Sequence, residues 1–466
     1  MFFNIKPSDR AALVTPDGSC VTYAELADRA SFFKEKCNAR RLALCLCENS
    51  PASVIGYVGF LGNGTVPLLL DKKIDPALLS NLMDIYRPTY LYVPGDMADR
   101  FSSYTKTGEM MSYALLRTTE EEKILERDEL ALLLTTSGST GSPKLVRQSY
   151  TNIQSNAEAI AEYLELTEDE RPITTLPMNY TYGLSIINSH LLVGATILMT
   201  DYAMTMKPFW NFAKEQRATS FGGVPFTYEM LKKIKFFKMD LPDLRYMTQA
   251  GGKLSPELHR EFAEWCEERG KKFIVMYGQT EATARMAYLP AERSLEKYGS
   301  MGFAIPGGKF ILEGTDGREI TEPDVVGELI YEGPNVTLGY AVCLEDLDKE
   351  DERHGRLATG DMAKRDADGF YYIVGRKKRF LKVFGNRVNL DEIDRLLKQK
   401  FDGVDFASAG TDDHVKTYMT DAGRTAEVRR WLSETTHLSE SAFEVFYIDE
   451  IPKNEAGKVL YVKLPQ

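Results

Sequence analysis

LLTTSGSTGSPKLV, residues 133–146, is the stretch of this chain that decides the fold. The apolar residues before Thr135 predict a buried strand, which leads directly into a loop rich in glycine, serine and threonine. Glycines let backbone N–H groups turn towards one point, hydroxyl groups add donors, and a lysine adds positive charge. We therefore predict that the loop binds a polyphosphate. The predicted binding residues are Thr135, Thr136, Ser137, Gly138, Ser139, Thr140, Gly141 and Lys144.

This loop is not the common P-loop, whose pattern G-x-x-x-x-G-K-[ST] places the lysine directly after a glycine. Here Lys144 follows Ser142 and Pro143. A flexible polar linker is the structural alternative. Because such a linker rarely follows an apolar run such as LALLL, phosphate binding is the favoured interpretation.

Length, charge and composition narrow the class of protein. The chain has 466 residues and, at roughly 100–200 residues per domain, this predicts two to four units. Its net charge of −11 argues against a nucleic-acid or anionic-membrane partner. An anionic ligand such as ATP would therefore need a local positive site. The composition leaves the oligomeric state open.

Cysteine and histidine usage gives no sign of a disulfide framework or a zinc site. Cys45 and Cys47 alternate in LALCLCE, so we interpret them as small core residues on one face of a strand rather than metal ligands. The N-terminal MFFNIKPSDR lacks the pattern of a signal peptide, and no apolar run is long enough to span a bilayer. These features predict a cytoplasmic protein without a membrane span.

Strand and helix patterns alternate through the first three hundred or so residues. This alternation predicts an α/β fold of parallel, doubly wound sheets with helices on both faces. The strand candidates are RLALCLC, TVPLLL, TYLYVP, ALLLTT, ATILMT, RYMTQAGG and KKFIVMYG. The helix candidates are Tyr23–Lys36, Ala77–Tyr86, Ser155–Leu164, Met206–Glu215, Tyr228–Phe236 and Pro256–Arg269. Ligands of such sheets bind beyond the carboxyl ends of the strands.

The pattern changes near Met301. Short β-rich pieces, GKFILEG, GELIYEGP and GFYYIVG, predict a small β-barrel-like subdomain over about 300–377. Beyond the basic run RKKR, helix candidates at Leu390–Gln399 and Arg424–Glu434 and strand-like FASAG, TYMT and FEVFYIDEIP predict a small α+β terminal domain.

Six segments, in order, resemble the AMP-forming adenylating superfamily, which includes acyl-CoA synthetases, adenylation domains and beetle luciferases. The segments are TTSGSTGSPK (135–144), YGQTEATAR (277–285), GELIYEGPNVTLGY (327–340), ATGDMAKRDADGFYYIVGRKKRFLK (358–382), GNRVNLDEID (385–394) and PKNEAGK (452–458). The resemblance covers nearly the whole chain. It implies that a carboxylate attacks the α-phosphorus of ATP, and that a thiol then displaces AMP.

The resemblance assigns roles around the second segment. Glu281 is implied as the Mg²⁺ ligand, Thr280 as a hydrogen-bond donor to the α-phosphate, and Tyr277 as the aromatic that stacks on adenine, beside Gly278. Taken alone, Thr280 and Glu281 more often begin a helix, and Tyr277 could be a core tyrosine. The glycines Gly251 and Gly252 in TQAGGKLS are implied on the nucleotide side, where Lys253 replaces a commonly small residue.

Further roles fall near the C-terminal end. Asp361 and Arg376 are implied as ribose ligands, and Lys458 as the lysine that contacts the substrate carboxylate and the α-phosphate. Outside the family pattern, each would be an ordinary polar residue in a turn, surface or tail.

The resemblance also implies a domain boundary. Lys378 occupies the hinge position between an N-terminal domain, 1–377, and a mobile terminal domain, 378–466. Lys382 is implied in thioester formation and Gly385 at the passage of the thiol arm. The terminal domain is short for the family.

The acid pocket is expected to include Tyr180, Tyr182, Gly183, Val224 and Ala282, within stretches that extend to Arg285. Tyr180 stands where many CoA ligases have histidine. Amino-acid-activating relatives carry an acidic residue nearby, but none occurs between Pro177 and Ala195, so an α-amino acid is disfavoured.

Three hypotheses follow for function. The first is an ATP- and Mg²⁺-dependent ligase that joins a small non-amino carboxylic acid to CoA. The second is a stand-alone adenylating enzyme that loads the phosphopantetheine thiol of a carrier protein, which the short terminal domain would suit. The third is a non-catalytic nucleotide-binding protein, and a luciferase-like oxidation also stays open.

Overall fold

The computed structural model describes residues 1–118, 123–135, 144–383, 386–436, 438–454 and 457–465. The chain divides into two compact units. The first comprises Met1–Lys309 with Tyr331–Leu357, and the second comprises Phe310–Ile330 with Ala358–Gln466. The predicted hinge at Lys378 stays a prediction.

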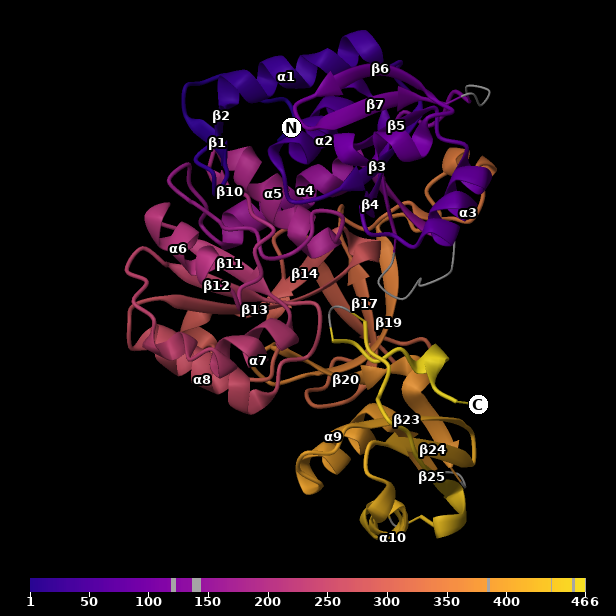
Figure 1. Cartoon of the computed structure of the whole chain (residues 1–466). Coiled ribbons are helices and arrows are strands. Elements are labelled where there is room, and N and C mark those ends of the chain that lie inside the picture. The colour runs from indigo at the N-terminus through magenta and orange to yellow at the C-terminus, as the bar shows by residue number, and fades with distance from the viewer. Residues whose placement is uncertain (119–122, 136–143, 384–385, 437, 455–456, 466) are drawn as a thin grey trace. The chain divides into compact units, whose positions relative to one another are not determined.

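The first unit contains a mixed eight-stranded sheet of order β18-β9-β8-β4-β3-β5-β7-β6. Figure 1 labels its strands β3, β4, β5, β6 and β7. Its central strands β8, β4, β3 and β5 are parallel, while β9, β18, β7 and β6 add antiparallel edges. The parallel sheet that the alternation predicts is therefore found in the centre but not at the edges, where the consecutive pairs β6–β7 and β8–β9 form hairpins and β18 joins β9 from far along the chain. The strands are β3 (Leu42–Cys47), β4 (Val66–Asp71), β5 (Tyr90–Pro94), β6 (Thr105–Met110), β7 (Tyr113–Arg117), β8 (Leu130–Thr135), β9 (Leu145–Ser149) and β18 (Gly339–Ala341).

A second sheet of the same unit has the order β11-β12-β13-β14-β15. Its first three strands are parallel and the last two antiparallel. A smaller sheet joins β10, β1 and β2. The strands are β1 (Ala11–Val14), β2 (Cys20–Thr22), β10 (Ile197–Leu198), β11 (Ser220–Gly223), β12 (Tyr246–Gln249), β13 (Lys272–Gln279), β14 (Ala284–Tyr288) and β15 (Phe303–Ala304).

Helices cover both faces of the second sheet. On β13, Phe273 packs against Phe262 of α8 and Tyr228 of α7. Its neighbours Ile274 and Met276 point to the other face and join a cluster with residues of α4 and α5. The predicted doubly wound α/β architecture is therefore confirmed. The helices of this unit are α1 (Tyr23–Lys36), α2 (Pro51–Asn63), α3 (Pro76–Tyr86), α4 (Tyr150–Tyr163), α5 (Thr181–Val193), α6 (Lys207–Glu215), α7 (Pro225–Lys233) and α8 (Pro256–Glu267).

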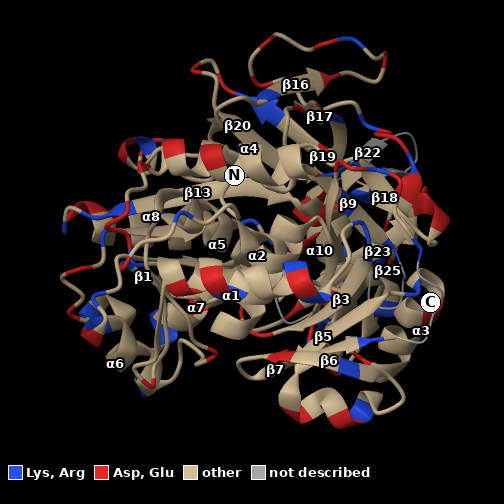
Figure 2. Ribbon diagram, turned by 90° about the horizontal axis from the view of Figure 1, so that it is seen from above, with Lys and Arg blue, Asp and Glu red and all other residues tan. Residues whose placement is uncertain are grey.

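The spacing of apolar residues in the sequence does not predict helices α2 and α5, because both helices are apolar almost all round. Neither contains Lys, Arg, Asp or Glu, as Figure 2 shows, whereas α1 carries charge along its length. Ser50 caps α2 at its start and Gly64 ends it in the left-handed conformation, with φ of 75°. A helix buried on every side has no polar face to reveal its period.

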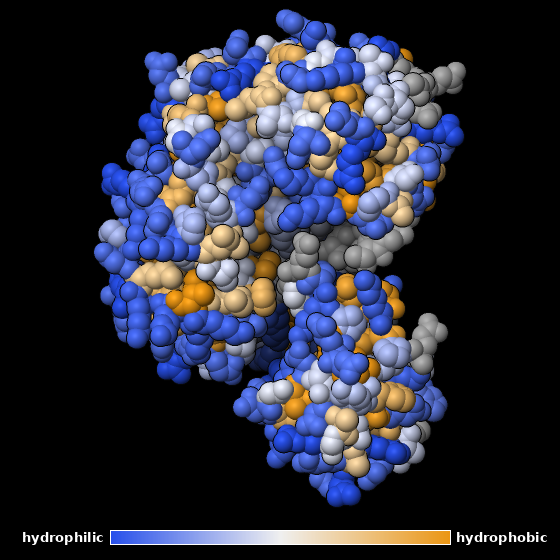
Figure 3. Space-filling model, in the orientation of Figure 1, coloured by the Kyte–Doolittle hydropathy of each residue, from blue (hydrophilic) through white to orange (hydrophobic). Residues whose placement is uncertain are grey.

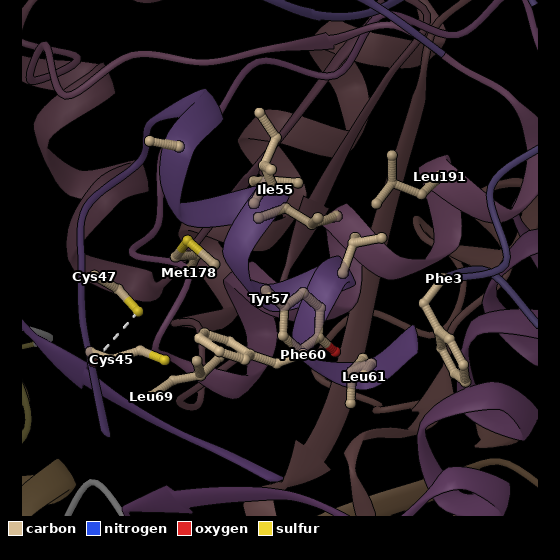
Figure 4. Close-up of a cluster of buried hydrophobic side chains, with 14 of the residues drawn as sticks. Phe3, Cys45, Cys47, Ile55, Tyr57, Phe60, Leu61, Leu69, Met178 and Leu191 are labelled. Carbon is tan, nitrogen blue, oxygen red and sulfur yellow. Dashed lines mark hydrogen bonds between the residues drawn. The ribbon is translucent and has the colours of Figure 1, made fainter. Parts of the chain in front are cut away.

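The α2 helix lies in the largest core cluster. In Figure 4 its residues Ile55, Tyr57 and Phe60 lie among side chains from other elements, including Met178 and Leu191. Cys45 and Cys47 are buried in the same cluster and form no disulfide, which confirms their interpretation as core residues. Burial raises the pKa of both thiols.

The second unit contains most of a four-stranded sheet, β16-β17-β19-β20, a hairpin of β21 with β22, and a sheet of order β23-β24-β25. Its two terminal helices and three terminal strands agree with the predicted small α+β domain. The elements are β16 (Lys309–Glu313), β17 (Gly327–Glu332), β19 (Arg356–Arg365), β20 (Tyr371–Arg376), β21 (Phe380–Val383), β22 (Asn386–Asn389), α9 (Leu390–Lys400), β23 (Phe406–Thr411), β24 (His414–Met419), α10 (Thr425–Thr436) and β25 (Phe443–Tyr447).

Short 3₁₀ helices complete the chain. They are η1 (Gly95–Phe101), η2 (Phe236–Lys238), η3 (Thr280–Ala282), η4 (Ala291–Arg293), η5 (Glu345–Asp348), η6 (Lys377–Arg379), η7 (Ala422–Arg424), η8 (Glu440–Ala442) and η9 (Tyr461–Lys463). The face in Figure 3 is mostly hydrophilic, with apolar residues in small groups. Among the described residues, no helix is both long and apolar enough to cross a membrane.

The glycines of α2 offer a matched test of packing. A Cβ at Gly59 would overlap the Phe33 ring, where α1 crosses α2, while a Cβ at exposed Gly62 would lie 4.0 Å from its nearest neighbour. We expect Gly59→Ala to lower the free energy of unfolding by about 1–3 kcal/mol. Gly62→Ala should raise it by up to about 1 kcal/mol, because alanine favours helix. Thermal or urea unfolding would measure both, and equal effects would contradict this packing.

Candidate functional site

The predicted phosphate loop is closed at its base by strand pairing. Thr135 ends β8 and pairs with Leu145, the first residue of β9, in an antiparallel register. The described ends of the loop are therefore fixed beside each other. The remaining predicted binding residues, Thr136, Ser137, Gly138, Ser139, Thr140 and Gly141, lie outside the described residues.

One aromatic ring joins the loop lysine to the predicted metal ligand. The Lys144 Nζ lies 3.3 Å from the centroid of the Tyr340 ring. The hydroxyl of the same tyrosine donates a hydrogen bond of 2.7 Å to Glu281 Oε1. Tyr340 belongs to β18, which pairs with β9 so that Tyr340 lies opposite Val146. Lys144, which follows the predicted phosphate loop, and the Glu281 carboxylate, far apart in sequence, thus contact the same side chain.

The turn that carries Glu281 is held by its main chain. The Glu281 carbonyl accepts hydrogen bonds from the Thr337 N–H at 3.1 Å, the Thr337 hydroxyl at 3.0 Å and Arg353 Nη1 at 3.0 Å. The Arg353 guanidinium also stacks on the Tyr340 ring, with 4.6 Å from Cζ to the centroid. Thr280 begins the short helix η3 rather than an α-helix, and its carbonyl accepts from Gln148 Nε2 at 3.3 Å. The alternative of a helix start therefore holds in a short form, with Gln279 rather than Thr280 as the cap, and the role of Thr280 toward the α-phosphate stays a prediction.

Tyr340 donates to the carboxylate at neutral pH. Burial, and secondly the Glu281 carboxylate, raises the pKa of Tyr340 to about 12. The phenol therefore keeps its proton. Glu281 itself is half-buried and forms no ion pair within the described part of the chain. Its carboxylate is available to a cation.

Sequence reasoning missed Tyr340 and Arg353. Tyr340 lies in the segment GELIYEGPNVTLGY, so the motif contained the residue, but only the fold reveals its two contacts. Arg353 lies in DERHGR, outside the six segments that resemble the superfamily. No local signal could have found it.

Several residues predicted for the nucleotide and acid pockets converge. A Cβ at Gly251, which has φ of +83°, would lie 2.7 Å from the Tyr180 hydroxyl and 3.0 Å from Val224 Cγ1. Glycine is therefore required both by backbone conformation and by space. A Cβ at Gly252 would similarly approach the Pro225 ring, at 3.1 Å.

Tyr277 and Gly278 lie at the end of β13. Tyr277 is half-buried, and its hydroxyl accepts from Gln279 Nε2 at 3.1 Å, so the core alternative does not describe it fully. A Cβ at Gly278 would overlap the Ala284 carbonyl of β14. Their roles toward adenine stay predictions.

The other predicted acid-pocket residues are tightly packed. Tyr182 is buried on α5 and donates to the Thr248 carbonyl at 2.9 Å. Gly183 lies against the Pro177 carbonyl, which leaves no space for a Cβ. Ala282 is buried, and its carbonyl accepts from Asn335 Nδ2 at 2.8 Å. The Tyr182 hydroxyl is therefore engaged within the protein.

The second unit pairs the two predicted ribose ligands. Asp361 on β19 lies opposite Arg376 on β20, and Arg376 Nε is 2.7 Å from Asp361 Oδ1. The Asp361 side chain is 3% exposed and the arginine 55% exposed. The ion pair with Arg376 thus helps to hold the carboxylate in place.

The remaining predicted residues of this unit lie further along its chain. The Lys458 N–H donates to Asn454 Oδ1 at 2.9 Å, which closes the loop before the lysine. Lys382 lies on β21, opposite Arg387, and its side chain is outside the described residues, as is the whole of Gly385. The roles of these residues stay predictions.

Comparison with known proteins identifies the family. The model of the AMP-binding enzyme family matches residues 4–341. The chain is 30% identical over 347 residues to indoleacetate–CoA ligase of Aromatoleum aromaticum, which covers 70% of this chain and 65% of that protein. It is 27% identical over 422 residues to 2-succinylbenzoate–CoA ligase of a Geobacillus strain, and this match spans 86% of this chain and 82% of that protein.

The fold has a solved counterpart. O-succinylbenzoate coenzyme A synthetase of Bacillus subtilis, in complex with AMP, superposes with a TM-score of 0.80 at 23% identity over 100% of this chain and 97% of that one. The chain belongs to the AMP-binding enzyme family. Its membership of the AMP-forming adenylating superfamily, which the motifs indicated, is confirmed.

The contacts of Tyr340 can be separated by two substitutions. Tyr340→Phe removes only the hydrogen bond to Glu281, and Tyr340→Ala also removes the ring beneath Lys144. We expect Phe to weaken binding of magnesium–ATP by about tenfold, the usual loss for a hydrogen bond to a charged group, and Ala to weaken it further. Calorimetric titration would measure both. Wild-type affinity in the Phe variant, with unchanged unfolding temperature, would contradict the role of the hydroxyl.

Proposed function

We propose that this protein activates a non-amino carboxylic acid with ATP and then transfers the acyl group to the thiol of coenzyme A. The observation that carries the proposal is the Tyr340 ring, which brings the phosphate-loop lysine Lys144 and the Glu281 carboxylate together. A cation donor and an acidic metal ligand, side by side, suit a nucleotide triphosphate with magnesium. The two ligase relatives support the same chemistry.

The described residues fit a magnesium ion held mainly by its substrate. Among them, no cluster of three or more His, Cys, Asp or Glu side chains could enclose a metal. Glu281 offers one carboxylate, and Mg²⁺ commonly takes one or two carboxylates with phosphate oxygens and water. When bound, Mg²⁺ would neutralise negative charge on the phosphates.

The first step joins the acid to the nucleotide. A carboxylate oxygen forms a bond to the α-phosphorus, and the bond from that phosphorus to pyrophosphate breaks, which gives acyl-AMP. In this proposal Lys144 binds the departing phosphates, and Thr280 and Lys458 donate hydrogen bonds to oxygens around the α-phosphorus. Donors fixed in advance stabilise the added charge without reorganisation.

Ribose and thiol contacts complete the proposed cycle. Asp361 accepts hydrogen bonds from the ribose hydroxyls, and its ion pair with Arg376 keeps the carboxylate in place. The thiol then loses its proton to solvent, its sulfur forms a bond to the acyl carbon, and the bond from that carbon to AMP breaks. Lys382 and Gly385 are assigned to this step by the resemblance alone.

Different observations limit the class of acid substrate and the identity of the thiol acceptor. The buried helix α5, which follows Tyr180, carries no acidic side chain that could pair with an α-amino group. The relatives are named as CoA ligases, which favours CoA over a carrier protein. Their names do not agree on the acid, because indoleacetate has one carboxylate and 2-succinylbenzoate has two.

Lys458 and Lys453 form a matched pair for testing the first step. Both lie in PKNEAGK, but exposed Lys453 forms an ion pair with Asp405 at 2.7 Å. We expect Lys458→Ala to reduce acid-dependent ATP–pyrophosphate exchange by about 100- to 1,000-fold, and Lys453→Ala to leave it near wild type. A panel of carboxylic acids would be assayed. Equal loss in the two variants would count against the role of Lys458, and no exchange with any acid would refute the proposed function.

The acceptor is tested separately. With an acid that supports exchange, we expect free CoA to yield an acyl thioester and AMP, and a holo carrier protein to remain unloaded. Mass spectrometry of the two thiols measures the products, and hydroxylamine trapping of acyl-AMP serves as the control for the first step. Loading of the carrier without CoA turnover would replace CoA by the carrier as acceptor.

A further inference from the structure

Arg285 is a buried cation beside the predicted acid pocket. It lies on β14, opposite Gly278 of β13, and is only 2% exposed. Its carbonyl accepts from Asn156 Nδ2 at 2.8 Å and Asn335 Nδ2 at 3.1 Å, so its backbone is fixed. The guanidinium therefore has a defined position inside the unit.

The guanidinium contacts only neutral groups. Its Nε donates to Ser185 Oγ at 3.1 Å, and its Nη1 donates to the Tyr163 hydroxyl at 3.0 Å and contacts Met276 Sδ at 3.4 Å. The Cζ lies 5.2 Å from the centroid of the Tyr182 ring. Within the described chain it has no carboxylate partner, and its Nη2 makes no hydrogen bond.

Arg147 shows what a buried arginine with a purely architectural role looks like in this chain. It is also fully buried. It donates to the carbonyls of Tyr340, Lys349, Leu338 and Glu350, and its Nη2 is 2.9 Å from Glu352 Oε2. Its charge is paired and its donors are used. Arg285 differs in both respects.

The groups around Arg285 supply no compensating negative charge. Burial, and secondly the positive charge of Arg285, lowers the pKa of His190 to about 4, so this histidine is neutral near pH 7. Burial, and secondly the Glu170 carboxylate, raises the pKa of Tyr246. This carboxylate is itself paired with Arg245, whose Nη1 lies 2.9 Å from Glu170 Oε1. The hydroxyls of Ser185 and Tyr163 have other acceptors, because they donate to the Tyr182 carbonyl and Met276 Sδ.

An unpaired buried cation is costly, since removing a charge from water is repaid only by a counter-charge and hydrogen bonds. The position suggests where that counter-charge comes from. Arg285 ends the segment YGQTEATAR, which begins at Tyr277 and contains Glu281. Its guanidinium contacts Tyr182 and Ser185 of α5. These elements are the ones expected to enclose the acid.

We propose that Arg285 binds a second anionic group of the acid, so that the substrate is a dicarboxylic acid rather than a monocarboxylic one. This inference rests on the proposed function and adds the substrate class. The planar fork of a guanidinium matches a carboxylate with two hydrogen bonds. One carboxylate of the acid reacts with ATP, and the other binds the Arg285 guanidinium. A sulfonate offers the same oxygens and forms a separate arm of the test.

Matched acids provide the substrate test. Linear and aromatic dicarboxylic acids are compared with their own mono-amides, which keep length and shape but lose one charge, and with the corresponding sulfonates. For wild type we expect pyrophosphate exchange to favour the dicarboxylate. In Arg285→Met, kcat/KM for the dicarboxylate should fall by about 30-fold or more, as for loss of one partner of a buried charge pair, while that for the mono-amide should not fall.

The unfolding temperature of the unliganded protein distinguishes a ligand-binding arginine from one with only a structural role. Because Ser185 and Tyr163 keep their other acceptors, Arg285→Met removes an unpaired charge and leaves no orphaned hydroxyl. Its unfolding temperature should equal or exceed that of wild type. Arg147→Met is the control, and it should lower the unfolding temperature because Glu352 and four carbonyls lose their partner.

A binding assay separates this inference from the proposed function. The dicarboxylate should raise the unfolding temperature of wild type, and not of Arg285→Met, whether or not acyl-AMP forms. Exchange without preference for the second charge, or equal losses with both acids in Arg285→Met, would refute the role of Arg285 and leave the ligase activity intact. Preference for the sulfonate would overturn the dicarboxylate assignment in favour of a sulfonated acid.

Discussion

The ring of Tyr340 is the contact on which the site of the first unit depends. Lys144 lies 3.3 Å from its centroid and the hydroxyl donates to Glu281, so one neutral side chain contacts both a cation and a carboxylate. Had Lys144 and Glu281 paired directly, each would have neutralised the other, and neither would attract phosphate or metal as strongly. The neutral phenol keeps the two charged groups close together.

The backbone around Tyr340 is fixed by a second set of interactions. Buried Arg147 donates to the carbonyls of Leu338 and Tyr340 on either side of Gly339, whose φ is 121°. Arg353 donates to the Glu281 carbonyl at 3.0 Å. Arg147, whose donors are used, thus orders strand β18, and Arg353 orders the turn that carries Glu281. Arg285, by contrast, has donors and charge in excess of its partners, which is the feature expected of a residue that completes its contacts with a ligand.

The fold was predictable where helices have one polar face. The predicted helix Tyr23–Lys36 is the observed α1, and Ala77–Tyr86 differs from α3 by one residue at its start. The failures have physical causes. Helices α2 and α5 are surrounded by apolar neighbours, so their sequences have no polar stripe. The antiparallel edges of the large sheet depend on which strand lies next to which, and β18 reaches β9 from nearly two hundred residues away, as their register records.

The sequence alone indicated the kind of chemistry to expect, because a loop rich in glycine and hydroxyl residues, a Thr-Glu turn and spaced lysines are local patterns of residue type. It also determined the family, since those patterns occur in a fixed order. Only the tertiary structure decided which residues meet. Tyr340, Arg353 and Arg285 acquire their meaning from neighbours that are distant along the chain. The net effect of a charge depends on the partners and the solvent around it, and chain folding alone sets both.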